Sequence, residues 1–167
     1  MEHFNVLPAT LVFPTDSILD VDVSGLLEQH TERKSVATVL TFNVPAQEAI
    51  DKYGVIVTDA EGRVTEFVEK PNQEQADRII ERTGSEVFLT NAGFYMLDAA
   101  ACREVAQCSE IRRMRERSLD FGKDFLPWLV QNDYPVHTRP IGMVGDLGNI
   151  PAYLDTMLRV LRGEFPK

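Results

Sequence analysis

Residues 11–27 read LVFPTDSILDVDVSGLL, and this stretch decides which kind of fold the chain can adopt. The apolar run at its start, residues 11–13, is typical of a short buried strand, and it leads into Asp16. Two more acids follow at Asp20 and Asp22, and a segment with helical spacing begins directly after them. We therefore expect Asp20 and Asp22 to end the strand and to start a helix, which is the local pattern of an α/β protein.

Strand and helix patterns alternate along the rest of the chain. Strands are predicted over 35–44 and 86–98, a β-hairpin over 53–71 around the turn DAEG, and an extended segment over 135–144. Helices are predicted over 23–33, 73–82, 98–107 and 122–131, with the charged segment 109–118 as a loop or a frayed helix. A final helix, opened by Asn149 and Pro151 and closed by Gly163, is expected to turn five apolar side chains inward: Tyr153, Leu154, Met157, Leu158 and Leu161. No repeat, low-complexity tract or linker divides the sequence, so we predict one α/β domain over residues 1–167.

The charge balance restricts the kind of partner. The chain has 26 acidic and 17 basic residues and a formal net charge of -9, which argues against nucleic acid or an anionic membrane surface as the main partner. No apolar run approaches the length of a membrane span, and no signal-peptide pattern opens the sequence. The composition instead favours a small ligand, with a cation carried between the ligand and the acids.

The two cysteines and three histidines carry no metal pattern. Cys102 and Cys108 lie six residues apart in an apolar helical pattern, and we interpret them as core thiols of a cytoplasmic protein. The histidines, His3, His30 and His137, lack partners at metal-ligand spacing, so we interpret them as structural or exposed.

Two distant acids are candidates for a metal site. Asp16 follows a predicted strand, and Asp146, in VGDLGNIP, follows an extended segment and precedes a capped helix. Ligands of open α/β sheets bind beyond the carboxyl ends of the strands, and two carboxylates there could hold Mg²⁺. The alternative is that Asp16 is a turn residue and Asp146 an acid at a helix entry. A rival motif is Asp20-Val21-Asp22, because an acid-x-acid pair after an apolar strand is the metal motif of nucleotide-sugar glycosyltransferases.

An ordered set of motifs carries a family resemblance over nearly the whole chain. The set is LVFPTDSILDVDVSGLL, YGVIVTDAEGRVTEFVEKP, TNAGFYMLD, DFGKDFLPWLV and GDLGNIPAYLDTMLRVLRGE, in this order. It resembles the sugar-1-phosphate nucleotidyltransferases, and the nearest members are mannose-1-phosphate guanylyltransferase and its glucose-1-phosphate relatives. The resemblance implies a Rossmann-like mixed sheet of the nucleotide-diphospho-sugar transferase type.

The resemblance also implies roles for the catalytic residues. The family's two Mg²⁺-binding acids fall on Asp16 and Asp146, and the lysine of its EKP motif falls on Lys70, which would face phosphate. The implied reaction is an in-line attack by a sugar-1-phosphate oxygen on the α-phosphate of a nucleoside triphosphate, with release of pyrophosphate. The protein would position the two phosphates and offset their charge without a covalent intermediate.

The implied sugar-binding residues come from three further motifs. They are Tyr53 and Gly54 at the hairpin entry, Glu69 of EKP, and the NAG motif Asn91, Ala92 and Gly93. Glu69 would accept sugar hydroxyls. Because adjacent strand residues point to opposite faces, Glu69 and Lys70 can serve one site only if the strand ends there, as Pro71 indicates. Without the family, we would favour a solvated strand end for Glu69-Lys70 and a bulge or turn for Asn91–Gly93.

The resemblance leaves part of the family pattern without a counterpart. The family opens with a strand and a glycine-rich loop that binds the triphosphate, and no such loop precedes Asp16 in this sequence. Residues 2–10, EHFNVLPAT, resemble the end of the helix and loop that precede the metal-acid strand. We therefore expect a domain truncated at its N-terminal half, which keeps the sugar and metal half and is inactive alone.

Three interpretations of function remain open at this point. The first, which we favour, is a fragment or shortened form of a nucleotidyltransferase. The second is a non-catalytic relative that binds sugar phosphate or completes another subunit. The third is a glycosyltransferase-like domain that uses Asp20 and Asp22. Because the strand at 11–13 is central in the family, we also expect an open sheet edge beside it, and self-association or a partner chain there.

Overall fold

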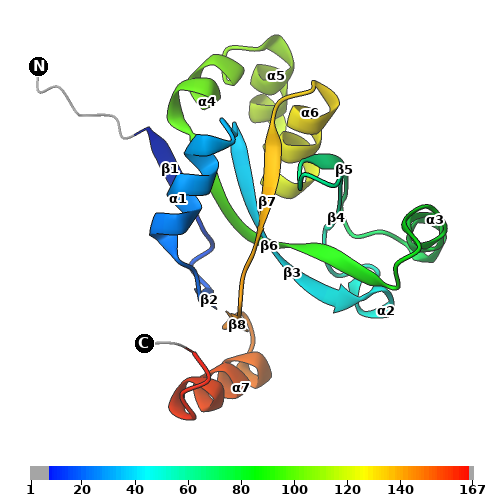
Figure 1. Cartoon of the computed structure of the whole chain (residues 1–167), viewed down its shortest axis with the longest axis vertical. Coiled ribbons are helices and arrows are strands. Elements are labelled where there is room, and N and C mark those ends of the chain that lie inside the picture. Colours follow the sequence, from blue (N-terminus) through cyan, green and yellow to red (C-terminus); the bar gives the residue numbers. More distant parts are fainter. Residues whose placement is uncertain (1–7, 166–167) are drawn as a thin grey trace, which may run out of the picture.

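Two long strands, β3 (Ala37–Pro45) and β6 (Val87–Asp98), form the centre of the sheet in the computed structural model, which describes residues 8–165 (Figure 1). They pair antiparallel with each other, and β7 (Val136–Pro140) pairs parallel with β3 on its other side. The β-branched sequence ATVLTFNV suits β3, whose first five residues are buried. The predicted α/β class with a mixed, Rossmann-like sheet is confirmed.

The two halves of β6 have different neighbours. The first half pairs with β4 (Val55–Thr58), which forms the predicted hairpin with β5 (Val64–Val68). The second half pairs with β1 (Ala9–Val12). A separate two-stranded sheet joins β2 (Ser17–Leu19) to β8 (Val144–Asp146). The predicted strand at 11–13 therefore overlaps β1, but its predicted burial is wrong, because β1 has no fully buried residue and Phe13 is 57% exposed. Residues 1–7 of the preceding segment lie outside the described residues.

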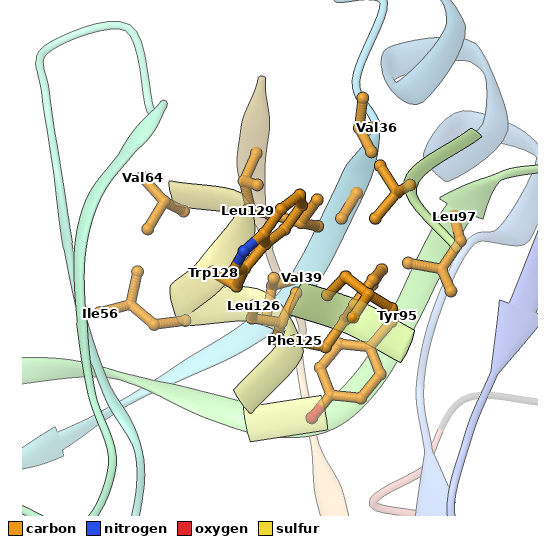
Figure 2. Close-up of a cluster of buried hydrophobic side chains, with 14 residues drawn as sticks. Val36, Val39, Ile56, Val64, Tyr95, Leu97, Phe125, Leu126, Trp128 and Leu129 are labelled. Carbon is orange, nitrogen blue, oxygen red and sulfur yellow. The ribbon is translucent and has the colours of Figure 1, made fainter. Parts of the chain in front are cut away.

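Helices cover both faces of the sheet. On one face lie α4 (Ala99–Val105), α5 (Ser109–Arg117), the π-helical turn η1 (Phe121–Phe125) and α6 (Leu126–Gln131). On the other face lies α1 (Val23–Glu32), while α2 (Ala46–Ala49) and α3 (Gln73–Thr83) pack at the far end of β3 and β4 (Figure 1). The strand period of two divides the side chains between the layers. Val39 and Tyr95 join the α4–α6 core (Figure 2), and Leu40 and Phe94 join the α1 core.

Several helix ends follow the sequence signals. Asp22 accepts a hydrogen bond from the Gly25 N–H at the start of α1, which confirms that this acid begins a helix. Asp98 and Asn149 cap α4 and the last helix, α7 (Ile150–Leu161). The predicted loop or frayed helix at 109–118 is instead the nine-residue helix α5, which buries Ile111.

The predicted inward face of α7 is wrong. The five side chains are between 36% and 75% exposed: Tyr153, Leu154, Met157, Leu158 and Leu161. The residue that α7 buries is Thr156, which packs on Gly145 of β8 and donates a hydrogen bond to the Asp146 carbonyl at 2.9 Å. Because α7 packs on the small β2–β8 sheet and not on the main core, its apolar stripe stays exposed.

The cysteines and histidines have structural surroundings. Cys102 and Cys108 are free thiols that pack against the main core, and burial raises the pKa of Cys102 to about 11. His30 is 3% exposed, while His137 is half-buried and His3 lies outside the described residues. Among residues 8–165, no helix combines the length and the apolar character that a membrane crossing requires.

We predict that stability falls as the pH drops below about 6.5, because two histidines are held neutral. Nδ1 of His30 lies 2.8 Å from the Thr38 hydroxyl, and Nε2 is buried without a partner among residues 8–165. Burial lowers the pKa of His30 and of His137 below 6.5. The negative charge of Asp98 raises the pKa of His30, but by less than burial lowers it. The unfolded chain therefore binds these protons at higher pH than the native chain does, so stability is full above pH 6.5 and is lost below it.

Urea unfolding at pH 7.5 and pH 5.5 checks this expectation. The wild-type midpoint should be lower at pH 5.5, and His30→Asn, which removes one titrating group, should narrow the difference. Equal midpoints for the wild type at the two pH values would contradict it.

We also predict self-association through β1. Within residues 8–165, β1 pairs with β6 on one side only, and edge-strand N–H and C=O groups template pairing with another chain. Sedimentation velocity should show a fraction of dimer that rises with protein concentration. Thr10→Lys, which adds a charge at an exposed position of β1, should shift the chain toward monomer, whereas Thr65→Lys on the edge strand β5 should not. A monomer at high concentration, with the β1 amides protected from hydrogen exchange, would show that the edge is already covered.

Candidate functional site

A cavity of about 670 Å³ opens between the bulged middle of β6 and the β2–β8 sheet. Segments far apart in the sequence meet there: β3, the entry to β4, the end of β5, the middle of β6, the β7–β8 connection and α7. The lining residues are Ser17, Phe42, Asn43, Lys52, Tyr53, Gly54, Glu69, Asn91, Ala92, Gly93, Ile141, Gly142, Met143, Val144, Asp146 and Arg159. Of the predicted site residues, all but Asp16 and Lys70 are in this lining.

A β-bulge turns the NAG segment into the cavity. Val39 of β3 lies opposite Tyr95, and Thr41 lies opposite Asn91, so three residues of β6 face Leu40 alone. Gly93 has a φ of +79°, which a residue with a side chain rarely adopts. The Asn91 Oδ1 accepts a hydrogen bond from the Gly93 N–H at 2.9 Å and so holds the bulge in shape.

The Glu69 carboxylate lies against backbone from a different segment. A Cβ on Gly54 would lie 2.7 Å from the Glu69 Oε2, so the carboxylate can lie this close to the backbone because residue 54 is a glycine. The Asn91 N–H donates to the Gly54 carbonyl at 2.8 Å, which ties the hairpin entry to the bulge. Burial raises the pKa of Glu69, the positive charge of Lys70 opposes this, and Asp120 raises the pKa further. Glu69 is thus a half-buried acceptor at the inner end of the cavity.

Asp16 and Asp146 lie close together at the other end. Ser17 pairs with Asp146 across the β2–β8 sheet, and the Leu147 N–H donates to the Asp16 carbonyl at 2.8 Å. A Cβ on Gly148 would lie 3.1 Å from Asp146 Oδ1 and 3.5 Å from Asp16 Oδ2, so both carboxylates face one point. Both side chains are exposed. No cluster of three or more possible metal-ligating His, Cys, Asp or Glu side chains occurs within residues 8–165, so this point has two carboxylates and no third.

Lys70 follows the end of β5, as Pro71 predicts. The strand ends at Val68, and Lys70 has a φ of +47° in an exposed bend. The lining of the cavity includes Glu69 but not Lys70.

Sequence reasoning missed two cations in the cavity lining, Lys52 and Arg159. Lys52 lies 4.6 Å from the centre of the Tyr53 ring, and its pKa is raised by hydrogen bonding with Tyr53 and, more weakly, by Glu48 and Asp146. Arg159 donates to the Val144 carbonyl at 3.2 Å and forms an ion pair with Glu164 at 3.4 Å. The position of Lys52 next to Tyr53 could have signalled it, whereas nothing in the sequence relates Arg159 to the other site residues.

The rival acids Asp20 and Asp22 lie outside the cavity lining, although Asp20 adjoins it at Gly142. Asp22 caps α1 and lies 3.6 Å from Arg139 in an ion pair. The Asp20 carboxylate lies beside Gly142, where a Cβ would be 2.8 Å from its Oδ2. Neither acid is part of the cavity lining.

A site of this shape, with a half-buried acceptor at one end and two carboxylates beside cations at the other, suits a polar ligand that carries phosphate. The sequence model of the nucleotidyl transferase family matches residues 2–163. The chain therefore belongs to the nucleotidyl transferase family, and the resemblance to sugar-1-phosphate nucleotidyltransferases is confirmed.

Curated relatives give the same family. The chain is 31% identical over 152 residues to a glucose-1-phosphate adenylyltransferase of Thermosipho africanus. The aligned region covers 91% of this chain and 34% of the relative. The chain is 29% identical to the enzyme of that name from Thermus thermophilus, over 96% of this chain and 40% of the relative. A UTP–glucose-1-phosphate uridylyltransferase of Synechocystis is 29% identical, over 89% of this chain and 34% of the relative. The chain thus spans less than half the length of these relatives.

Proposed function

We propose that this chain is the sugar-phosphate- and metal-binding part of a sugar-1-phosphate nucleotidyltransferase. The reaction transfers a nucleotidyl group from a nucleoside triphosphate to a sugar-1-phosphate and yields a nucleoside-diphosphate sugar and pyrophosphate. The observation that carries the proposal is the cavity in which Tyr53, Gly54, Glu69, Asn91 and Asp146 meet from separate segments. The family membership supports the reaction type.

The sugar would lie at the Glu69 end of the cavity. The half-buried Glu69 carboxylate would accept hydrogen bonds from sugar hydroxyls, and the absence of a side chain at Gly54 leaves room for this carboxylate. Asn91, Ala92 and Gly93 would contact the sugar from the bulge of β6. Tyr53 would bound the ring on the side of Phe42, with which it makes an edge-to-face contact at 5.3 Å.

The metal end would be Asp16 and Asp146. Two carboxylates that face one point offer hard oxygen ligands of the kind that Mg²⁺ binds, so the residues fit the ion. Mg²⁺ bound there would offset the negative charge of the phosphates and take its further ligands from their oxygens and from water. Asp16 and Asp146 would hold it, and the Gly148 N–H, which donates to Asp146 Oδ1 at 2.7 Å, would fix the carboxylate.

The phosphate would meet positive charge from three side chains. Lys52 and Arg159 line the cavity near Asp146. Lys70 adjoins Glu69 in an exposed bend and forms no ion pair within residues 8–165. We propose that it turns toward phosphate when substrate binds. The chemical contribution of all three is to hold the attacking phosphate oxygen in line with the α-phosphate.

For the substrate, we propose glucose-1-phosphate. The curated relatives carry names of glucose-1-phosphate enzymes, and they differ in the nucleotide, adenylyl or uridylyl. Mannose-1-phosphate with GTP is the alternative that the motif resemblance raises. A non-catalytic sugar-phosphate-binding relative, or one that completes another subunit, uses the same cavity and differs only in turnover.

We predict that the chain binds glucose-1-phosphate in a Mg²⁺-dependent manner. Isothermal titration calorimetry should show binding that weakens on removal of Mg²⁺, and Asp16→Asn or Asp146→Asn should weaken it by about tenfold or more, since each removes a charged ligand. Mannose-1-phosphate, titrated in parallel, tests how strongly the site distinguishes the sugar. Glucose, titrated in the same way, tests how much of the affinity depends on the phosphate.

Asp22→Asn is the matched control for this prediction. Asparagine also caps a helix, so α1 should remain intact and the affinity should be unchanged. Loss of binding in Asp22→Asn with retention in Asp16→Asn and Asp146→Asn would instead support the glycosyltransferase-like interpretation.

We also predict that residues 1–167 alone have little or no nucleotidyltransferase activity. Positioning of the triphosphate is a large part of catalysis in such transfers, and this sequence has no glycine-rich loop before Asp16. The check is pyrophosphate release with glucose-1-phosphate and ATP, UTP or GTP. Turnover at about 1–10³ per second, the ordinary range for enzymes, would contradict the prediction.

A further inference from the structure

The Glu69 carboxylate touches a second glycine, Gly122, which none of the proposed roles includes. A Cβ on Gly122 would lie 3.0 Å from Glu69 Oε2, which is tighter than most real contacts of a Cβ. Gly54, which directly precedes β4, adjoins the same oxygen, since a Cβ on Gly54 would lie 2.7 Å from it. Within residues 8–165 this carboxylate accepts no hydrogen bond, so it occupies the space that the two missing side chains leave, and a side chain at either glycine would displace it.

Gly122 has this position because the chain makes a π-helical turn. In η1, both the Asp124 N–H and the Phe125 N–H donate to the Asp120 carbonyl at 3.0 Å, which widens the turn by one residue. The Asp120 carboxylate accepts from the Lys123 N–H at 2.8 Å and closes the turn from the other side. Such turns are rare and occur often at functional sites.

The turn is held from behind by the core. Phe125 is buried in the main cluster, beside Leu126 and Tyr95 (Figure 2). The Phe121 ring stacks on the Tyr95 ring at 5.3 Å with an interplanar angle of 11°. The backbone at Gly122 therefore has little freedom to retreat from the cavity.

The same turn contacts the second polar group at the inner end of the cavity. A Cβ on Gly122 would lie 3.5 Å from Asn91 Nδ2. That Nδ2 donates to the Tyr95 hydroxyl at 2.9 Å, and Tyr95 carries Phe121 on its ring. One π-turn thus adjoins both Glu69 and Asn91, although Glu69 lies 53 residues and Asn91 lies 31 residues before Gly122 in the sequence.

We propose that Gly122 is a positioning residue for sugar recognition, through which the π-turn sets the Glu69 carboxylate and the Asn91 amide for the hydroxyls of the hexose. This inference rests on the proposed function, because it assigns the sugar to the Glu69 end. It predicts a separation of effects. A side chain at position 122 should weaken recognition of the sugar and leave recognition of phosphate and Mg²⁺ at the Asp16–Asp146 end unchanged.

The test compares wild type with Gly122→Ala by calorimetry, with two probes in the presence of Mg²⁺. Glucose-1-phosphate reports on both ends of the cavity, and inorganic phosphate reports on the phosphate end alone. We expect Gly122→Ala to weaken glucose-1-phosphate binding by about tenfold, because a small displacement of a binding group costs affinity steeply. Inorganic phosphate should bind the variant as it binds wild type. Equal loss for both probes, or no loss for either, would overturn the inference.

A double-mutant cycle tests whether Gly122 acts through Glu69. In a Glu69→Ala background, which removes the group that the new side chain would displace, Gly122→Ala should cost less than about twofold, since groups that act as a unit are not additive. Full additivity would assign the effect to another route. The titration of Glu69, followed by carbon NMR of its carboxyl group and identified by its loss in Glu69→Gln, should also shift in Gly122→Ala. A general loss of stability would leave that titration in place, and an unshifted titration contradicts the inference.

A second substitution keeps the inference testable if the single variant does not fold. If Gly122→Ala does not fold, Gly122→Ala with Glu69→Asp withdraws the carboxylate by one methylene and removes the overlap. We expect this double variant to fold, and its failure to fold would overturn a role through Glu69. The two hypotheses stay separate, because wild type that does not bind glucose-1-phosphate refutes the proposed function, whereas wild type that binds and a variant that binds equally well refutes only the role of Gly122.

Discussion

The register shift between β3 and β6 is the constraint on which the rest of the structure depends. Val39 faces Tyr95 and Thr41 faces Asn91, so β6 must fit three residues opposite one residue of β3. A bulge of this kind bends the strand and increases its twist. The bend lets β6 pair with β4 before the bulge and with β1 after it, and both pairings leave the NAG segment facing the cavity. The glycine at 93 permits the backbone to make this turn.

The electrostatics of the cavity follow from how its two ends are built. The inner end is made of core strands and of the π-turn, so Glu69 loses water and its pKa rises. The outer end is made of the small β2–β8 sheet, so Asp16 and Asp146 stay exposed beside each other. The sugar phosphate that we propose as ligand, with an uncharged polar ring and a charged phosphate, would match these two environments.

Helix α7 shows how a polar residue can anchor an apolar helix. Thr156 is buried because its methyl group packs on Gly145 and its hydroxyl reaches the Asp146 carbonyl, while the leucines of the helix remain exposed. This attachment also brings Arg159 into the cavity lining, one turn further along the helix. The β2–β8 sheet and α7 therefore form one unit. This unit positions Asp146, Asp16 directly before β2, and the cation of Arg159 together.

The sequence by itself determined the elements whose signals are local. The hairpin around Gly62 and the caps at Asp22, Asp98 and Asn149 could all be predicted, because each depends on neighbours within one turn or one hairpin. The ordered motifs also indicated seven residues of the cavity lining, whereas Asp16 and Lys70, which they indicated as well, lie outside it. Only the tertiary structure decided that α7 faces the small sheet, that Arg159 joins the site, and that Gly122 lies against Glu69. These contacts join residues far apart in sequence, and they depend on strand register and on packing, which side-chain periodicity within one segment does not report.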